Sequence, residues 1–370
     1  MSQTIDIEAI GLDERLQQGL ELILEGDHAS AIAAFDAVLA HQPDWWEVWV
    51  EKGKALTNLG CSTDAIACFA QAVQLQPHMA LPHYSLGWAA YSLGNYEEAL
   101  VNFRTVLTLE PEFPDGYYST GLAIYALGQY EEAIGYFRRA LEGQSTCADL
   151  WYCQGFCLYA THRYEGAVQH FTHALELQPA DQEALLGRGD ALKELGDYEA
   201  AIASYNKALS LNSDSGEVLL RKAACLKQAG RLQEAALIYQ QVTGENASYW
   251  EGWYGLAGIQ LKLGNFEAAI ASYEKTLDLH PQSYESWFNR GVALKNLNRL
   301  PEAIASYDKA LELRPDDHRA WNNRGGTLVS MGRLADAIAC FDKVLELNPE
   351  DAKAQQNRAV LQKRLEASGG

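Results

Sequence analysis

The stretch Tyr284–Asp317, YESWFNRGVALKNLNRLPEAIASYDKALELRPDD, is 34 residues long and decides the fold. Two sets of its residues are each spaced by four and then three positions: Trp287, Gly291 and Leu294, and then Ala303, Tyr307 and Ala310. This spacing places each set on one face of a helix. The stretch therefore predicts two consecutive amphipathic helices.

Three residues mark the ends of these two helices. Asn298 tolerates the left-handed conformation that ends a helix. Pro301 follows where a new helix can begin without losing a needed N–H, and Pro315 cannot continue the second helix. The stretch therefore predicts a helix, a turn and a second helix.

The same pattern recurs with a period of 34 residues and no insertion, in units that start at residues 12, 46, 80, 114, 148, 182, 216, 250, 284 and 318. All ten units carry the second-helix alanine, namely Ala31, Ala65, Ala99, Ala133, Ala167, Ala201, Ala235, Ala269, Ala303 and Ala337. All ten also carry an aromatic residue four positions later, and a glycine or alanine at the eighth position of the first helix. A small residue there lets two antiparallel helices approach closely.

This pattern resembles the tetratricopeptide repeat. The resemblance implies an all-α fold, a right-handed α-solenoid in which first helices line the concave inner surface. We expect residues 1–11 to be a lead-in, residues 12–351 to hold ten repeats, and residues 352–370 to form a capping helix and tail. The family implies protein–protein interaction as the function.

Composition narrows the function classes. The chain has 370 residues, a net charge of −20 and a pI near 4.8, which argues against nucleic acid and an anionic membrane surface as partners. No apolar run reaches the length of a membrane span, and the acidic start MSQTIDIEAIGLDERL is unlike a signal peptide. We therefore expect a cytoplasmic protein, with seven scattered cysteines as free thiols.

We predict neither catalysis nor a cofactor, because the sequence holds no phosphate loop, nucleophile elbow or His-Glu metal helix. An alternative reading is a metal or small-ligand carrier that uses the fifth unit. Its candidate ligands are Cys153, Cys157, His170 and His173. Buried free cysteine is nevertheless common, so structural thiols are the preferred interpretation.

Some members of the resembled family hold a peptide C-terminus with a two-carboxylate clamp of lysine and asparagine. Asn289, Asn323 and Asn357 match its last position, but the matching lysine sites hold Tyr254, Phe288 and Asn322. The incomplete set predicts that this clamp is absent.

The candidate binding surface lies at the fifth, ninth and twelfth positions of the first helices in units three to five. These residues are Tyr84, Trp88, Tyr91, Tyr118, Leu122, Tyr125, Tyr152, Phe156 and Tyr159. In the next two units the same positions hold Leu186, Asp190, Lys193, Leu220, Ala224 and Lys227. The aromatic block is therefore local, and repeat packing alone does not require it. The rings either form a partner groove or pack against one another between first helices.

We interpret the chain as a scaffold, adaptor or assembly chaperone that binds a helix or peptide segment of a protein partner. Asp115 and Asp149 would select a basic flank of that segment. The wording of the repeats also resembles large cyanobacterial repeat proteins, some of whose relatives assist assembly of photosynthetic complexes. An assembly factor for such membrane complexes is therefore a further alternative, without direct insertion into the membrane.

Overall fold

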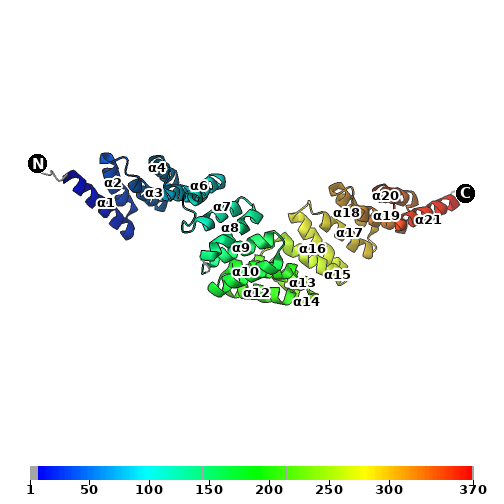
Figure 1. Cartoon of the computed structure of the whole chain (residues 1–370). Helices are drawn as coiled ribbons and strands as arrows, with labels where there is room; N and C mark the ends of the chain where they lie inside the picture. Colours follow the sequence, from blue (N-terminus) through cyan, green and yellow to red (C-terminus); the bar gives the residue numbers. More distant parts are fainter. Residues whose placement is uncertain (1–6, 144–145, 213–214, 369–370) are drawn as a thin grey trace, which may run out of the picture. The chain divides into compact units, whose positions relative to one another are not determined.

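The computed structural model describes residues 7–143, 146–212 and 215–368. In these ranges the chain is all-α, without a strand, and short turns join the helices (Figure 1). The helices are α1 (Ile7–Glu25), α2 (His28–His41), α3 (Trp46–Asn58), α4 (Ser62–Leu75), α5 (Ala80–Ser92), α6 (Tyr96–Leu109), α7 (Gly116–Ala126), α8 (Tyr130–Gly143), α9 (Ala148–Ala160), α10 (Tyr164–Leu177), α11 (Gln182–Glu194), α12 (Tyr198–Leu211), α13 (Gly216–Gln228), α14 (Leu232–Glu245), α15 (Trp250–Lys262), α16 (Phe266–Leu279), α17 (Tyr284–Asn296), α18 (Leu300–Leu313), α19 (His318–Ser330), α20 (Leu334–Leu347) and α21 (Ala352–Ser368).

Consecutive helices pack as helix-turn-helix pairs, and each pair stacks on the next. The helix α5 packs on α6, α6 packs on α7, and α5 also touches α7. The same three kinds of contact join α17, α18 and α19. The prediction of an all-α solenoid of helix-turn-helix repeats is confirmed.

The chain divides into two compact units, Met1–Leu195 and Gly196–Gly370. The boundary falls inside the sixth repeat of the predicted register. Each unit has its own apolar core. One core cluster of the first unit surrounds Phe103 and Phe137, and one of the second surrounds Tyr273 and Tyr307.

Glycine at the eighth position of a first helix allows its second helix to come close. A Cβ atom added to Gly121 would lie 2.7 Å from Cε1 of Phe137, and one added to Gly291 would lie 2.6 Å from Cε1 of Tyr307. Both aromatic side chains are fully buried. Because real Cβ atoms do not approach carbon so closely, the aromatic ring occupies the space that any other residue would need. The predicted packing reason for the small residue is confirmed.

The turn within each pair depends on one residue in the left-handed conformation. Asn298 has φ 60°, as the sequence predicted, and His162 has φ 60° at the same place in the fifth unit. At Asn298 the backbone N–H donates to the carbonyl of Lys295, and the next N–H donates to that of Leu294. These two bonds satisfy carbonyl groups that the end of a helix leaves without partners.

The turn between pairs carries a bond that the periodicity did not predict. At the fourth position of several first helices, a side-chain N–H donates to the backbone carbonyl six residues earlier. The bonds are Trp49 to Pro43 (2.8 Å), Trp253 to Ala247 (3.0 Å), Trp287 to Pro281 (2.9 Å), Trp321 to Pro315 (2.8 Å) and Gln355 to Pro349 (2.7 Å). His83 Nε2 lies 3.1 Å from the Pro77 carbonyl in the same arrangement. The tryptophans of the repeat pattern therefore fasten one repeat to the next.

At the ends of the chain, residues 1–6 of the expected lead-in and residues 369–370 of the expected tail lie outside the described part. The helix α1 begins at Ile7, and α21 packs on α20. Ala354 and Leu361 of α21 are buried in a cluster with Phe341 and Val344. This helix covers apolar side chains of the tenth unit.

Candidate functional site

The nine residues predicted to line a groove lie on α5, α7 and α9, three to a helix, in the first compact unit. We call them the aromatic surface: Tyr84, Trp88, Tyr91, Tyr118, Leu122, Tyr125, Tyr152, Phe156 and Tyr159. All nine side chains are half-buried, and most pack on the core cluster around Phe103 and Phe137. They are neither free-standing nor fully enclosed.

Within each of the three repeats, the rings of the aromatic surface pack partly on the second helix of the same repeat. The rings of Tyr84 and Trp88 lie 6.0 Å and 5.5 Å from that of Phe103, measured between ring centroids. Tyr91 lies 5.2 Å from Tyr96 at the start of α6. The related pairs Tyr118–Phe137, Tyr125–Tyr130, Tyr152–Phe171 and Tyr159–Tyr164 lie 5.7–6.3 Å apart in the next two repeats. One side of these rings is thus used for packing within the repeat.

Ring contacts between adjacent first helices are fewer. Tyr125 of α7 and Phe156 of α9 lie 5.4 Å apart in an edge-to-face arrangement. The other ring pairs of α5 and α9 named above stay within one repeat. This contact supports the alternative of mutual packing between first helices.

A cavity of about 490 Å³ opens beside the aromatic surface, between α3 and α5. Its lining residues are Lys54, Thr57, Asn58, Phe69, Leu81, Tyr84, Ser85, Trp88, Ala89 and Ser92. Tyr84 and Trp88 are residues that the sequence nominated, and the cavity extends the site by one repeat toward the N-terminus. Its volume lies within the range of small-ligand and side-chain pockets, about 300–1,000 Å³.

Sequence reasoning missed Leu81, Phe69 and Lys54 as lining residues. Leu81 stands at the second position of its unit, where eight of the ten units carry an acid. It is 37% exposed, although it is a large apolar side chain. This departure from the acidic pattern could have drawn attention to Leu81 in the sequence. Its role as a lining residue becomes evident only from the stacking of α3 against α5.

Two carboxylates lie close to the aromatic surface. Asp115 is exposed with φ 60° just before α7, and Asp149 is exposed in the first turn of α9. Burial raises the pKa of Tyr84, and the negative charge of Asp115 adds to that shift. Burial likewise raises the pKa of Tyr118, and Asp149 is among the neighbours that raise it further. Both carboxylates therefore act electrostatically on rings of the surface.

A second cavity, of about 350 Å³, includes two of the nominated residues in its lining. Asp115 and Tyr118 face it together with Phe113 and Arg139. Its wall mixes an acid, a guanidinium and aromatic rings. A partner that follows the aromatic surface would meet a polar edge here.

The four proposed metal ligands of the fifth unit are either buried thiols or imidazole rings packed against a tryptophan. Burial raises the pKa of Cys153 and of Cys157 to about 12, which disfavours the thiolate form that binds metals. His170 and His173 lie 5.2 Å and 4.7 Å from the ring of Trp151. Among the residues that the structure describes, no group of three or more His, Cys, Asp or Glu side chains could hold a metal ion. The carrier alternative finds no support in this geometry.

Arrangement and sequence together define a class, the α-solenoids built from helix-turn-helix repeats. The sequence profile of the tetratricopeptide repeat matches residues 16–80, 84–146, 158–216, 254–318, 288–352 and 322–367, and a second profile of that repeat matches residues 192–256. The chain belongs to the tetratricopeptide repeat family.

Solved structures share the fold at low sequence identity, whereas no curated protein sequence matches. The C-terminal part of a repeat protein from Cytophaga hutchinsonii is 17% identical, with a TM-score of 0.56, over 64% of this chain and 97% of that one. A tetratricopeptide repeat protein from Parabacteroides merdae ATCC 43184 is 20% identical, with a TM-score of 0.52, over 67% and 98%. The tetratricopeptide repeat domain of P58(IPK) is 18% identical, with a TM-score of 0.40, over 97% and 99%. Among the described helices, none is both long and apolar enough to cross a bilayer.

Proposed function

We propose that this chain is a non-catalytic interaction scaffold that holds an apolar segment of a partner protein on the aromatic surface. The segment is an amphipathic helix or an extended stretch with large apolar side chains. Asp115 and Asp149 contact a basic flank of the same segment. Family membership supports protein interaction in general, and the aromatic surface supplies the particular site.

The observation that carries this proposal is the cavity between α3 and α5. Tyr84 and Trp88 form part of its wall, and their rings are held in place by Phe103. A preformed apolar cavity of about 490 Å³ accepts one or two large side chains without ordering new residues of the scaffold. Half-buried tyrosine and tryptophan are also the residues that most often anchor interfaces.

The test is a direct binding measurement with a labelled amphipathic peptide that carries a lysine-rich flank. Replacing Tyr118, Tyr125 and Phe156 with serine removes three anchors, and central anchors contribute about 2 kcal/mol or more each. Because such values are not additive, we expect a loss of at least about 30-fold in affinity. Circular dichroism of the triple variant should remain helical.

A second variant separates binding from folding. Leu81→Glu places an acid in the cavity wall at a position where other units already carry Glu47 or Glu183, so the fold should be unaffected. The matched control replaces Leu24, Val101 and Leu237 with serine, because these apolar side chains are 88%, 65% and 66% exposed and lie on other helices. Equal binding by wild type and Leu81→Glu would rule out the cavity as part of the binding site. An equal loss of affinity in the triple serine variant and in its control would rule out the aromatic surface.

We also propose the domain organisation of residues 12–351 as ten repeats, with residues 352–370 as a cap and tail. Gln355 supports it, because its bond to the Pro349 carbonyl repeats that of the tryptophans in earlier first helices. The helix α21 thus follows the repeat register while it covers α20.

A further inference from the structure

The second compact unit carries a row of lysines on its first helices, one on each of three successive helices. Lys227 is at the twelfth position of α13, Lys262 at the thirteenth of α15, and Lys295 at the twelfth of α17. In the first unit, the cavity between α3 and α5 is lined by Thr57 and Ser92 at these same two positions. The register therefore places each lysine on the same face of its own first helix as Thr57 and Ser92 occupy on theirs.

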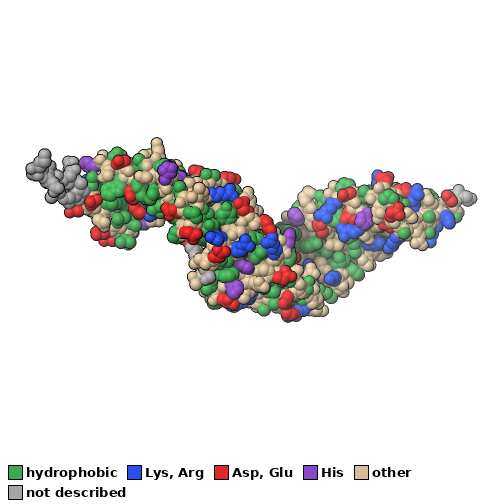
Figure 2. Space-filling model, viewed as in Figure 1, with side chains coloured by type: hydrophobic (Ala, Val, Ile, Leu, Met, Phe, Trp, Pro, Cys, Tyr) green, Lys and Arg blue, Asp and Glu red, His purple; other side chains and the backbone are tan. Residues whose placement is uncertain are grey.

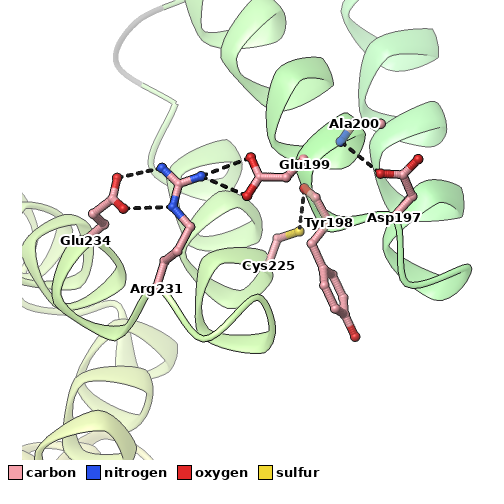
Figure 3. A network of polar contacts seen from close by, with 7 residues as sticks. All are labelled: Asp197, Tyr198, Glu199, Ala200, Cys225, Arg231 and Glu234. Carbon is pink, nitrogen blue, oxygen red and sulfur yellow. Dashed lines mark hydrogen bonds and ion pairs between the residues drawn. The ribbon is translucent and has the colours of Figure 1, made fainter.

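These lysines have no carboxylate partner among the described residues, although the chain has 49 acidic residues and only 29 basic ones. The arginines around them are paired. Arg231, one turn after Lys227, lies between Glu234 (2.7 Å) and Glu199 (3.1 Å), as Figure 3 shows. Asp and Glu side chains are also scattered over the visible face (Figure 2). In such an acidic protein, an unpaired row of cations is unexpected from composition.

Burial and neighbouring cations disfavour the charge of two lysines in the row, Lys227 and Lys295. Burial lowers the pKa of Lys227, and the ammonium group of Lys262 lowers it further. Burial lowers the pKa of Lys295, and Lys353 of α21 adds to the effect. Lys227 and Lys295 are half-buried and Lys262 is exposed. Half-buried cations close to other cations cost free energy in the unbound protein, and a bound anion would recover part of that cost.

The surface around the row has room for a chain. Lys295 reaches across to α19, where a Cβ atom added to Gly326 would lie 3.3 Å from its Nζ. Gly258 occupies the same register position on α15, and no side-chain or neighbouring atom lies within 4 Å of the place where its Cβ would be. Tyr254 and Phe288 are half-buried beside these glycines and provide apolar contact.

We propose that the lysine row, Lys227, Lys262 and Lys295, binds an acidic segment of a partner protein that carries a carboxylate at every third residue and apolar residues between them. Packed helices are generally about 8–10 Å apart, and a peptide in the polyproline II conformation has three residues per turn and advances about 3.1 Å per residue. One carboxylate at every third residue therefore matches one lysine on each helix. The net charge of −20 opposes the dense phosphate charge of nucleic acid more strongly than a few carboxylates spaced along a peptide, so we assign the site to a peptide.

This site differs from the two-carboxylate clamp of the family in both residues and geometry. The clamp positions here hold Tyr254, Phe288 and Asn322, none of which is a cation. The lysine row uses side chains two turns further along each first helix, and it accepts internal carboxylates rather than a chain terminus. It is also separate from the aromatic surface, which lies in the other compact unit.

The experiment measures binding of a fluorescein-labelled peptide, with glutamate at every third position, to the full-length protein. The variant Lys227→Gln, Lys262→Gln, Lys295→Gln should bind about 10- to 100-fold more weakly, since each half-buried ion pair contributes a few-fold. The corresponding triple arginine variant should keep most of the affinity. Wild-type binding should weaken as salt rises.

The matched control is Lys207→Gln, Lys275→Gln, Lys309→Gln, which removes the same charge from exposed positions on second helices. It should bind as wild type does. Absence of wild-type binding, an equal loss in the control, or a failure of the arginine variant to bind while it remains helical would overturn the proposal. Tighter binding of a single-stranded oligonucleotide of equal charge would also overturn it, because the partner would then be nucleic acid.

Discussion

A glycine-to-alanine pair within the fourth repeat tests the packing reason for the repeat pattern. Gly121 lies inside α7, where a new Cβ would be 2.7 Å from Cε1 and 2.8 Å from Cδ1 of Phe137. Gly135 lies inside α8 with nothing within 4 Å of its new Cβ. The chemical change is identical at both sites, and both sites are in helix interiors.

The two substitutions should have opposite signs. Alanine stabilises a helix interior by about 1 kcal/mol relative to glycine, so Gly135→Ala should stabilise the protein by about 0.5–1 kcal/mol. At Gly121 the same gain is opposed by overpacking against a fully buried ring, which costs about 1–3 kcal/mol or more. We expect Gly121→Ala to destabilise by about 1–2 kcal/mol net.

The assay is urea unfolding followed by circular dichroism, together with amide hydrogen exchange in α7 and α8. Exchange is needed because repeat proteins open locally, and a single global transition need not report one repeat. Adding Phe137→Leu to Gly121→Ala should recover part of the loss, since the smaller side chain relieves the contact. If both glycine variants shift stability in the same direction, the close-approach argument is wrong.

Two further predictions concern the second compact unit. Deleting residues 352–370 exposes the apolar side chains that Ala354 and Leu361 cover. Light scattering should then detect aggregation, or amide hydrogen exchange should detect fraying of α20. A truncated protein as soluble and as stable as the full chain would contradict the capping role. Burial alone would raise the pKa of Asp317, but hydrogen bonds from Arg319 and Tyr284 hold that pKa well below its usual 3.8. The ionised carboxylate therefore contributes to the stability of the fold above pH 3.8, and this contribution is lost as the pH falls below that value. Asp317→Asn should therefore cost about 1–2 kcal/mol at neutral pH and much less near pH 2 in denaturant titrations, and an equal cost at both would refute this assignment.

The sequence predicted the helices, the close glycine contacts and the left-handed Asn298, because each depends on residues within one 34-residue unit. It could not predict how far Tyr84 and Trp88 would rest on Phe103, since that depends on rotamers rather than on spacing. The cavity beside Leu81 arises where α3 and α5 stack, and the spacing within either helix does not define it. The net negative charge gave no indication of the lysine row in the sequence. Which basic residues form ion pairs, and which do not, is known only from the structure.

The bond from the fourth position of a first helix to the carbonyl six residues earlier bears on how such a chain changes its length. Tryptophan, histidine and glutamine all occupy this joint, with Trp287, His83 and Gln355 as examples. Where this bond forms, it needs a nitrogen at one place rather than a particular side chain, and the units with Tyr117, Leu185 or Leu219 at the fourth position do without it. A cut at one of these carbonyls, rejoined at another, restores the same bond, so whole repeats could be lost or duplicated without a new interface having to evolve.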